Sequence, residues 1–430
     1  MKRVLMTTFS YYPRDPRVVR EARALVDAGM HVDVICLRDP GMLKKVNLDG
    51  VNVFRVDLER KRAGKLRYIW QYFRFFLKSF RITTARHLRN RYDLIHVHNM
   101  PDFLVFSAIL PKLTGAKIVL DLHDPTPEIF MTKFGVDEKH WFIRTLRMIE
   151  KLSIRFANLV LTPNIAFRDI FVSRGCPEEK LRIVMNSPLE TVFHPGLLDT
   201  ERENPDDFVL MYHGGLLERS GVDLAVRAVH ELRNEIPSLV FHIYGSGEMS
   251  GRLLKLIDEL ELHSHVIFHS RVPLQDIARQ ISTVDVGIIP NRMSPFTNLN
   301  FPTRIFEYLA LDKPVIAPKT RGVQDYFGES GMNYFTAGDV ESLKQAIRSL
   351  YLQSGNAAEI HRHARDVYQQ HRWSIEKRRF VYAINSLIHG GPDSTLPGNE
   401  PQNGGPRRFT IETEIIDRTA WACTQESVSA

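Results

Sequence analysis

The chain has 430 residues, which is more than one ordinary hydrophobic core accommodates, so we expect two domains. Its apolar fraction of 43% and charged fraction of 25% are ordinary for a globular protein, and the formal net charge of +7 favours acidic partners. Three widely spaced cysteines exclude a disulfide framework, and the short apolar run at the N-terminus excludes a signal peptide, so we expect a cytoplasmic protein.

Strand-like and helix-like segments alternate along the first half of the chain, as in a parallel, doubly wound α/β sheet. Strands are predicted at 3–8, 31–37, 51–58, 93–97, 117–122, 159–161 and 181–184. Helices are predicted at 17–29, 103–113 and 139–156. This alternation predicts a first domain over residues 1–190.

Prolines and charges interrupt the alternation at 186–207, which is typical of a linker. The alternation then restarts and predicts a second domain over residues 205–372. Its strands are predicted at 208–212, 239–244, 265–268, 284–289 and 315–318, and helices at 222–235, 251–260, 274–281, 340–352 and 374–387. Gly, Pro and polar residues dominate 391–430, which predicts a mostly disordered tail, although the weakly alternating run 409–416 could dock.

The stretch 296–319 passes from a polar loop into a mostly apolar helix and then into a strand. Pro302 suits the first turn of this helix, where its missing N–H costs nothing. Glu307 lies within the apolar run, and a buried carboxylate is costly unless something pairs with it. A helix N-terminus followed by a carboxylate suits a nucleoside diphosphate, because phosphates need N–H donors and the ribose offers two hydroxyls. The alternative is a structural ion pair of Glu307 with Arg304 or another cation.

One glycine turn follows the first predicted strand of the second domain. Gly214 and Gly215 end this strand and precede Arg219. Glycines let a backbone approach a phosphate, and the arginine can clamp it. The alternative is a tight turn with a surface arginine.

A second glycine turn carries Gly245, Gly247 and Glu248 between a predicted strand and a helix. The glycine spacing differs by one residue from the dinucleotide pattern. Ser270 and Arg271 stand where an acidic ribose ligand is expected, so we discount NAD.

Polar residues also end two strands of the first domain. His123 and Asp124 end one strand at the presumed cleft, where a histidine can hold a sugar hydroxyl or stabilise developing charge. The alternative is a loop histidine with no role in binding or catalysis. His96 and His98 end another strand and are expected to face the same region. No spacing typical of a metal site occurs, so no metal is expected.

Taken together, these segments resemble the retaining GT-B glycosyltransferases of family 4 over nearly all of residues 1–390. PRDPRVVREARAL is similar to that family's first loop and helix, and LDLHD to its sugar-contacting strand. MNSPLETVFHP resembles its interdomain segment, with Asn186 in place. GGLLERSG, YGSGE and FPTRIFEYLALDKPVIA resemble its phosphate loop, glycine turn and donor-binding helix. The resemblance implies two Rossmann-like domains facing a central cleft, with the last helix, 374–389, crossing back to the first domain.

The sequence departs from the family pattern at two places. Gly215 and Ser220 stand where the family has a phosphate-binding Arg and Lys. Arg219 must therefore supply most of the positive charge that binds the phosphates. Leu299 stands where the family has the first of two glutamates, and Glu307 matches the second. Candidates to replace the missing glutamate are the backbone N–H groups of Asn300 and Phe301 and the side chain of Asn298.

The resemblance implies that a sugar moves from a nucleoside diphosphate sugar to an acceptor hydroxyl with retention, in the synthesis of cell-envelope or exopolysaccharide glycans and with no cofactor. Glu307 would hold the ribose, the backbone at Val272 would touch the base, and His123 and Asp124 would be catalytic. The other donor-binding residues would be Gly214, Gly215, Arg219, Gly245, Gly247, Glu248, Asn300, Phe301, Pro302, Thr303 and Arg304. The acceptor-side residues would be Arg14, Arg17, His98 and Asn186.

Two other function classes stay open at this point. A sugar-nucleotide epimerase or hydrolase on the same fold would rearrange or release the sugar without an acceptor. A non-catalytic sugar-nucleotide sensor would bind without turnover, although the intact Glu307 and His123 argue against it. The basic residues form no known nucleic-acid-reading motif, so nucleic acid is not an expected partner.

Residues 60–91 contain eleven lysines and arginines, interleaved with aromatic residues, and no acidic residue. At helical spacing, Ile69, Phe73, Phe76 and Phe80 form one apolar stripe flanked by cations. This stripe is either core with a solvated basic face, or a surface helix on anionic lipid. The resemblance favours the second, because family members that build cell-envelope glycans often dock through a basic patch on the N-terminal domain. We therefore expect peripheral binding to the inner face of the cytoplasmic membrane and a glycan or lipid-linked acceptor.

Overall fold

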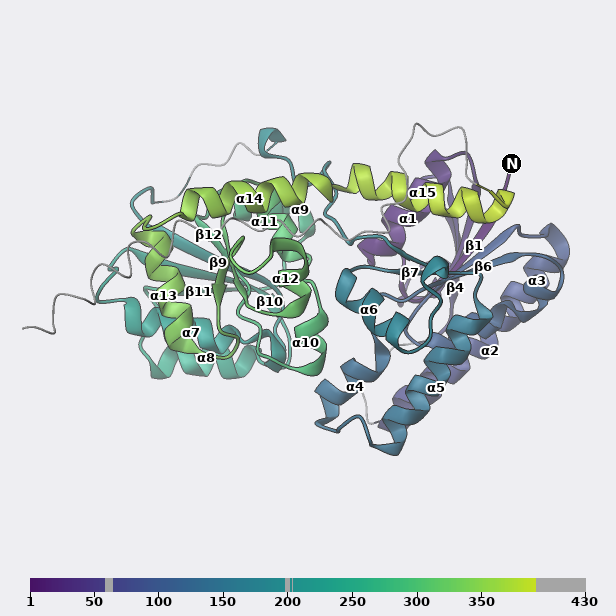
Figure 1. Cartoon of the computed structure of the whole chain (residues 1–430), viewed down its shortest axis with the longest axis horizontal. Coiled ribbons are helices and arrows are strands. Elements are labelled where there is room, and N and C mark those ends of the chain that lie inside the picture. The colour runs from purple at the N-terminus through teal and green to yellow at the C-terminus, as the bar shows by residue number, and fades with distance from the viewer. Residues whose placement is uncertain (59–64, 198–201, 203, 392–430) are drawn as a thin grey trace, which may run out of the picture.

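The computed structural model, which describes residues 1–58, 65–197, 202 and 204–391, contains two α/β domains that lie side by side (Figure 1). Each domain is built on one mainly parallel sheet. In β1 (Arg3–Tyr11), Leu5 joins the apolar core on one face of the sheet, while Val4 and Met6 join the core on the other. A sheet buried on both faces needs strands that are apolar throughout. The predicted fold class, two doubly wound Rossmann-like domains, is confirmed.

The first sheet has eight strands in the order β3-β4-β2-β1-β5-β6-β7-β8, and among the described pairs β3–β4 alone is antiparallel. Because β1, β5 and β6 are parallel neighbours, the loops that follow them open on one edge of the sheet. The remaining strands are β2 (His31–Leu37), β3 (Lys45–Leu48), β4 (Val51–Val56), β5 (Leu94–His98), β6 (Lys117–Asp121), β7 (Leu159–Thr162) and β8 (Leu181–Ile183).

Helix α1 (Pro16–Asp27) begins where its sequence favours a start: Asp15 caps it by accepting from the Arg17 N–H, and Pro16 occupies its first turn. Its inward face is buried and includes Glu21. The other helices of the domain are α2 (Lys65–Asn90), η1 (Asp102–Ala108), α3 (Ile109–Leu113), α4 (Thr126–Phe134), α5 (Trp141–Phe156), α6 (Ile165–Ser173) and η2 (Glu178–Lys180), and the short turn η3 (Pro195–Leu197) follows β8.

The second sheet has six parallel strands in the order β11-β10-β9-β12-β13-β14. They are β9 (Phe208–Gly215), β10 (Leu239–Ser246), β11 (Val266–His269), β12 (Val286–Ile288), β13 (Val315–Pro318) and β14 (Asn333–Phe335). The helices are η4 (Glu218–Ser220), α7 (Val222–Leu232), α8 (Ser250–Glu259), α9 (Leu274–Ser282), α10 (Pro295–Leu299), α11 (Arg304–Ala310), α12 (Arg321–Phe327), α13 (Val340–Tyr351) and α14 (Ala357–Gln370).

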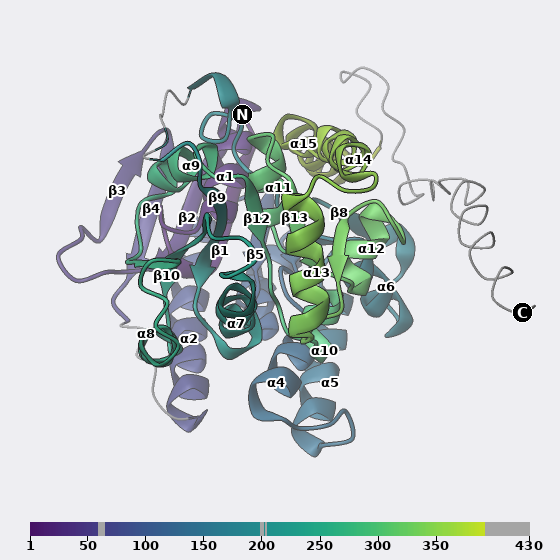
Figure 2. The same cartoon turned by 90° about the vertical axis from the view of Figure 1, so that its left-hand side faces the viewer.

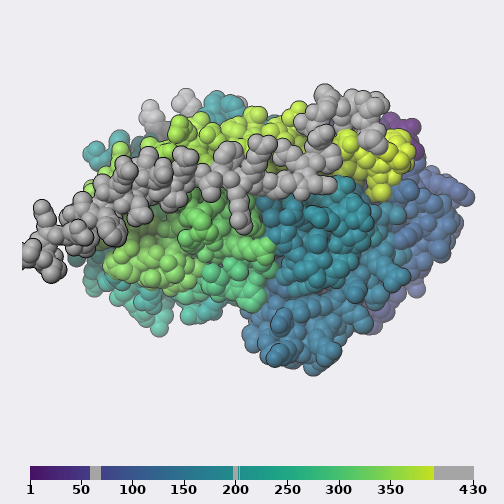
Figure 3. All heavy atoms as spheres, in the orientation of Figure 1, coloured from purple at the N-terminus to yellow at the C-terminus, as the bar shows by residue number. Residues whose placement is uncertain are grey.

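The last helix, α15 (Trp373–His389), leads from the second domain back over the first (Figures 1 and 2). Trp373, Phe380 and Ile384 are buried in the same apolar cluster as Val4 of β1. Figure 3 shows α14 and α15 as a yellow-green ridge along one edge of the molecule, from one domain to the other. The C-terminal helix is therefore part of the first domain's core.

Several elements differ from the sequence-based expectation. The helix expected from Pro302 begins at Arg304, because a tight turn with the bond from Ile305 N–H to Pro302 O precedes it. The helix expected at 103–113 is split into η1 and α3. Helices and strands that the sequence patterns did not predict are β3, α4, α6, α10, α12, β14 and α14, with α10 in place of the expected polar loop before Pro302. The predicted disordered tail, with its run 409–416, lies outside the described residues from 392 onward.

Within the described ranges, no helix combines the length and the hydropathy needed to cross a bilayer. Cys36 and Cys176 are free and buried. Neither observation bears on residues 392–430.

Candidate active site

Predicted site residues follow β1 and β6 in the first domain and β9 and β10 in the second, and others lie on or just before α11. The two sides are close, because the charge of Asp124 acts on Arg219 and that of Arg20 acts on Glu307. The two domains touch beside this site. The Phe296 N–H of α10 donates to Thr132 Oγ1 of α4 at 3.1 Å, and the Ile165 N–H donates to Tyr326 Oη at 3.1 Å. These two hydrogen bonds therefore join the first domain to the second beside the predicted site.

Glu307 lies on α11, whose residues Ile305, Phe306, Tyr308 and Leu309 are buried. Its side chain is only 15% exposed. Its Oε2 lies 3.2 Å from His213 Nε2 of β9, yet neither atom has a hydrogen-bond partner among the described residues. Burial raises the pKa of Glu307 to about 7, although the nearby Arg304 and Arg20 oppose that rise. The carboxyl group is thus held in place, desolvated and short of donors, which is the state that two ribose hydroxyls would satisfy.

Arg304 does not form the alternative ion pair with Glu307 in the described structure. Its Nη1 donates to the His213 carbonyl at 2.7 Å, and its guanidinium lies 4.6 Å from the centroid of the Tyr212 ring. A Cβ on Gly214 would lie 2.9 Å from Arg304 Nη1, and Gly214 has φ +127°. The positive φ favours glycine at position 214, and the missing Cβ also leaves room for the Arg304 guanidinium. Gly214 and Gly215 are exposed, so their backbone is open to a ligand.

Gly245 and Gly247 have a packing role in this structure. Added Cβ atoms would lie 2.1 Å from Gly214 O and 2.2 Å from Leu216 O, so glycines let the loops after β9 and β10 touch. The Gly247 N–H donates to Ser250 Oγ at 3.0 Å, so it is not free for a phosphate.

The other predicted donor-binding residues also belong to the second domain. The Asn300 N–H donates to Phe296 O at 2.9 Å and closes α10, so it too is engaged. Glu248 is exposed at the start of the loop to α8, and its charge acts on Arg219. Val272 is half-buried and packs against the core of the second domain. Phe301 and Pro302 are buried and Thr303 is half-buried, beside α11.

Arg219 lies on η4, in the loop that the sequence predicts to bind phosphate. Its guanidinium lies 5.5 Å from the centroid of the Phe296 ring. Burial lowers its pKa, and the charge of Asp124 in the other domain opposes this. Burial raises the pKa of Asp124, against the charges of Arg17 and Arg219. Ser220, at the family's lysine position, donates through Oγ to Gly215 O at 2.9 Å and is a turn-stabilising residue here.

His123 follows β6 and is 4% exposed. Its backbone N–H donates to Asn99 Oδ1 at 2.9 Å, and its Nε2 lies 2.9 Å from His98 Nδ1. The two rings are stacked with an interplanar angle of 4°. Burial lowers the pKa of His123 to about 3, although Asp121 opposes this, so the imidazole is neutral at neutral pH. A neutral, fixed imidazole can hydrogen-bond a sugar hydroxyl.

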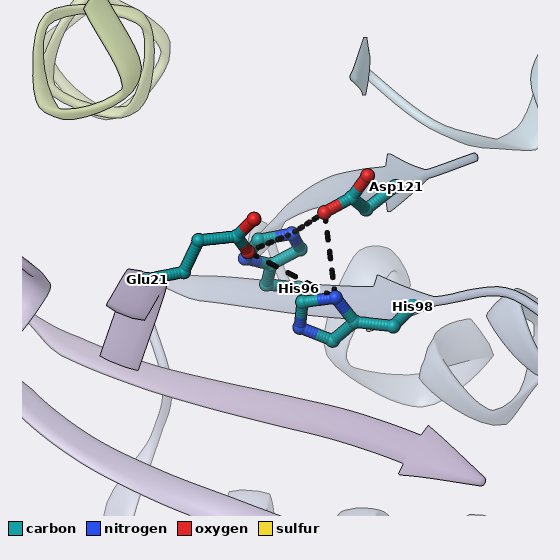
Figure 4. Close-up of side chains that lie close together, drawn as sticks. All are labelled: Glu21, His96, His98 and Asp121. Carbon is teal, nitrogen blue, oxygen red and sulfur yellow. Dashed lines mark ion pairs between the residues drawn. The ribbon is translucent and has the colours of Figure 1, made fainter. Parts of the chain in front are cut away.

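His96 and His98 do not face the cleft as expected, because both are 0% exposed beneath α1. There they meet Glu21 of α1 and Asp121 of β6, as Figure 4 shows. His98 is therefore not an acceptor contact, and its expected acceptor role is wrong in this structure. The sequence patterns pointed to neither Glu21 nor Asp121. The sequence did carry a signal for this cluster: His96 and His98 are two residues apart and so share one face of a strand, and Glu21 falls on the inward face of a helix.

The acceptor-side arginines have different surroundings. Arg14 is exposed and pairs with Asp39 at 2.7 Å, away from His123. Arg17 makes two bonds of 3.1 Å to Asp15, which raise its pKa although burial acts against them, and its charge also acts on Asp124. The structure therefore brings Arg17, and not Arg14, to the site.

Sequence reasoning missed Arg20. Its guanidinium donates to the Ser187 carbonyl and to Asn186 Oδ1, the latter at 3.2 Å, and lies 5.1 Å from the centroid of the Trp373 ring. Asn186 thus ties the interdomain segment to α1. Burial lowers the pKa of Arg20 to about 10, and its charge acts on Glu307 across the cleft.

Leu299 fills the place of the missing glutamate with apolar contacts. It is 9% exposed and belongs, with Phe296, to the apolar cluster of the first domain that includes Phe167. The Asn298 side chain accepts from the Arg321 N–H at 3.2 Å, so it is partly engaged. Glu307 is therefore the carboxylate that α11 places here, with no second one at position 299.

Two family descriptions match the chain: residues 15–187 match the glycosyl transferase 4-like domain, and residues 198–367 match the glycosyl transferases group 1. The chain is 24% identical over 341 residues to an uncharacterized glycosyltransferase of Methanocaldococcus jannaschii, covering 75% of this chain and 82% of that protein. It is 26% identical over 147 residues to the GDP-mannose-dependent alpha-(1-6)-phosphatidylinositol monomannoside mannosyltransferase of Mycolicibacterium smegmatis, covering 33% of this chain and 38% of that protein.

Solved structures agree on the fold. Sucrose-phosphate synthase from Thermosynechococcus elongatus superposes with a TM-score of 0.74 at 17% identity, over 91% of this chain and 100% of that one. Anabaena HepE in complex with UDP-glucose superposes with a TM-score of 0.65 at 18% identity, over 90% and 100%. The two family matches fall one on each half of this fold. The chain belongs to the group 1 glycosyltransferases with the GT-B fold.

Proposed function

We propose that this glycosyltransferase moves a sugar from a nucleoside diphosphate sugar to an acceptor hydroxyl with retention of configuration, in the synthesis of a cell-envelope or exopolysaccharide glycan. The observation that carries the proposal is the Glu307 carboxyl group, which is largely buried and has an oxygen without a hydrogen-bond partner. Two vicinal hydroxyls of a ribose supply two donors to one carboxylate. The UDP-glucose complex of Anabaena HepE, which shares the fold, supports a nucleotide-sugar donor.

The diphosphate of the donor binds between Arg219 and the open backbone of Gly214 and Gly215. A guanidinium binds phosphate oxygens through charge-assisted hydrogen bonds, and it stabilises the charge that the leaving diphosphate develops. Arg304 acts less directly, because its guanidinium is already bonded to the His213 carbonyl. It positions the β9 loop while adding positive charge. No metal ion is needed in this arrangement.

His123 and Asp124 approach the transferred sugar from the first domain. His123 is neutral and can bond a sugar hydroxyl, while Arg17 and Arg219 offset the charge of Asp124. Retention then needs no enzymic nucleophile, since the acceptor hydroxyl attacks on the face that the leaving diphosphate vacates. The departing diphosphate accepts the acceptor's proton.

The acceptor is a lipid-linked glycan reached from the inner face of the cytoplasmic membrane. On α2, Ile69, Trp70 and Phe73 are 46%, 57% and 43% exposed. With Phe103 they line a hollow of about 430 Å³. Arg74 and Arg81 are exposed on the same helix. Aromatic and cationic side chains together favour an anionic bilayer surface. The mycobacterial relative is named for a phosphatidylinositol-based acceptor, which supports a lipid acceptor here.

Helix α5 adds to this surface. Trp141, Met148 and Leu152 are 70%, 57% and 49% exposed on one helical face. Both α2 and α5 pack on η1 and extend to the same end of the first domain in Figures 1 and 2. We call the exposed residues Ile69, Trp70, Phe73, Arg74, Arg81, Trp141, Met148 and Leu152 the α2–α5 surface.

The function is tested by first finding the donor through thermal-shift screening of nucleotide sugars, because a ligand at a hundred times its dissociation constant stabilises by roughly 2.7 kcal/mol. Release of nucleoside diphosphate is then measured with and without lipid-linked acceptors. Release that depends on acceptor, with an anomeric configuration in the product that matches the donor by NMR, supports the proposal. Release without acceptor indicates a hydrolase or epimerase, and donor binding with no turnover indicates a sensor. Glu307→Gln is the matched control for donor binding.

A further inference from the structure

A second cluster of polar side chains lies inside the first domain, behind His123 and away from the donor. It consists of Glu21 on α1, His96 and His98 on β5, and Asp121 at the end of β6 (Figure 4). These residues are 5%, 0%, 0% and 4% exposed. They come from three elements that the sheet topology brings together, so no local spacing in the sequence reveals them.

The four facing atoms have the spacing of a coordination shell. His96 Nε2 lies 3.6 Å from Glu21 Oε2 and 3.4 Å from Asp121 Oδ2. His98 Nδ1 lies 3.8 Å and 3.3 Å from the same two oxygens. In a tetrahedral site with bonds of about 2.0–2.1 Å, ligand atoms lie about 3.3–3.4 Å apart. These four distances come within about 0.5 Å of that spacing, and all four atoms lie within 4.8 Å of one another, so one ion could contact all of them after the side chains adjust.

Hydrogen bonding in the cluster is incomplete. Glu21 Oε2 and His96 Nε2, which both face the centre of the cluster, have no hydrogen-bond partner among the described residues. An ion there would satisfy these two atoms, and the outer ring nitrogens His96 Nδ1 and His98 Nε2 would stay without a partner. Buried polar atoms without partners are costly, so native structures rarely keep them. Two buried carboxylates side by side add repulsion, and a divalent cation would cancel both charges.

We propose that Glu21, His96, His98 and Asp121 bind one divalent transition-metal ion, with zinc as the best fit. Two imidazoles and two carboxylates are ligand types that zinc accepts, and a set of four protein ligands favours it over ions that need six ligands. The site has no open position for a substrate, so the metal is structural: it ties α1 to β5 and β6 beneath the catalytic loop. The metal is separate from the donor diphosphate, for which no metal is expected.

The metal also affects His123. In its absence His98 Nδ1 lies 2.9 Å from His123 Nε2 and the two share a hydrogen bond. His98 Nδ1 has one lone pair, which cannot bind a metal ion and also take part in the hydrogen bond with His123. Metal binding would therefore break the hydrogen bond between His98 Nδ1 and His123 Nε2. His123 is then positioned by its backbone bond to Asn99 and is freer to contact a sugar. The competing arrangement is a metal-free cluster in which Glu21 and Asp121 share a proton.

The test is metal content of the full chain, purified with an affinity tag that binds no metal and without chelators. Plasma mass spectrometry of the wild type, before and after incubation with zinc and desalting, should give about one zinc per chain. Cobalt substitution should give the intense visible absorption of a four-coordinate ion. The variants Glu21→Gln and His96→Gln should lose the ion. The matched control is His242→Gln with His269→Gln, because this histidine pair on β10 and β11 also has ring nitrogens 2.9 Å apart and should leave the zinc content unchanged.

Wild-type protein that holds less than about a tenth of an equivalent after incubation with zinc would overturn the proposal and leave the shared proton. Equal loss of zinc in the β10–β11 control would also overturn it, because the ion would then sit elsewhere. Circular dichroism checks that the variants fold. Should they not fold, the wild-type metal content and the cobalt spectrum decide the matter alone.

Discussion

The carboxyl group of Glu307 faces His213 of β9, Arg304 of its own helix and Arg20 of α1. Burial raises its pKa to about 7, and the two arginines oppose this, while His213, with a pKa that burial lowers to about 3, stays neutral. Ribose hydroxyls donate to the ionised form. Affinity for the free nucleoside, which has no phosphate to titrate, should therefore fall as pH drops below 7 and approach a loss of about tenfold per pH unit.

The control for this prediction is Glu307→Gln, which keeps the side-chain volume and removes the charge. Charge-assisted hydrogen bonds contribute about 1.5–3 kcal/mol each, so nucleoside affinity should fall at least about tenfold above pH 7 and lose its pH dependence. Isothermal titration calorimetry between about pH 6 and about pH 8 measures both quantities. A wild-type affinity that is flat over this range contradicts the ribose assignment.

Arg219 and Arg304 should differ when each is replaced by alanine. Arg219 makes no ion pair among the described residues, so Arg219→Ala should weaken nucleoside diphosphate binding by about tenfold or more while sparing the nucleoside and the melting temperature. Arg304→Ala leaves the His213 carbonyl without its donor, so it should also lower the melting temperature. Calorimetry with both ligands and thermal unfolding separate the two cases. Equal losses for diphosphate and nucleoside in Arg219→Ala would show that Arg219 is structural.

His123 lies across the domain boundary from the diphosphate site. His123→Ala should lower turnover by about 10²-fold or more, because a positioned side chain at the reacting sugar contributes that much. Affinity for free nucleoside diphosphate should change little, since no diphosphate contact is lost. Steady-state kinetics and calorimetry on the same preparation give both values. Turnover at the wild-type level would remove His123 from the mechanism.

At the scale of elements, α2 shows what helical periodicity could and could not predict. Helical spacing predicted the helix correctly, but it left open whether the stripe of Ile69, Phe73, Phe76 and Phe80 is core or lies at the surface. The stripe is not the buried face. Tyr72, Phe75, Ser79 and Thr83 are buried instead, and Ile69 and Phe73 are exposed. A helix with apolar residues on more than one face leaves the choice to its neighbours, here Phe9 of β1, whose ring contacts Tyr72 and Phe75. Periodicity does not contain that information.

The exposed side of α2 leads to a prediction about membranes. Vesicles of anionic lipid should capture the protein, and capture should weaken as salt rises, because each basic residue near the surface contributes about 1 kcal/mol. Arg74→Glu with Arg81→Glu, and separately Trp70→Ser with Phe73→Ser, should each reduce capture. Lys65 and Arg67, also expected to contribute, have side chains outside the described residues.

The matched control reverses two exposed charges on the other domain, Arg227→Glu with Lys255→Glu. Sedimentation with neutral and anionic vesicles measures capture. Loss of capture in this control equal to the loss in the α2 variants would show that net charge, and not the α2–α5 surface, is responsible. Equal recovery on neutral and anionic vesicles would contradict the membrane proposal.

At the scale of the whole molecule, the sequence could place most site residues at strand ends but could not pair them. Alternation and glycine turns predicted His123 and Arg219 after strands, because parallel strands must end at a common edge. Glu307 was predicted from a carboxylate inside an apolar helix. Arg20 and Glu21 were missed, because charged residues on an amphipathic helix are expected on its solvent face. Both are buried here, since α15 covers α1 and Trp373 lies against Arg20. The burial of Arg20 and Glu21 therefore depends on α15, which begins more than 350 residues later in the chain.

The return of α15 to the first domain makes a prediction about stability. Phe380 is fully buried among residues of β1 and α1, so Phe380→Ala should cost about 3–5 kcal/mol in that domain. Two domains need not unfold together, so hydrogen exchange is a better measure than one melting temperature. Exchange of the β1 and β5 amides should accelerate at least about a hundredfold, and that of β9 and β10 should not change.

The control for α15 is Phe335→Ala, which opens a cavity of the same kind at the end of β14 in the second domain, where Phe335 is 1% exposed. Phe335→Ala should give the opposite pattern: amide exchange should become faster in β9 and β10 and should not change in β1 and β5. Acceleration of both sheets by either variant would mean that the domains open as one unit. Unfolding of one domain would then spread to the other through α14 and α15. Independent responses would show that α15 stabilises the first domain alone, although it follows the second domain in the chain.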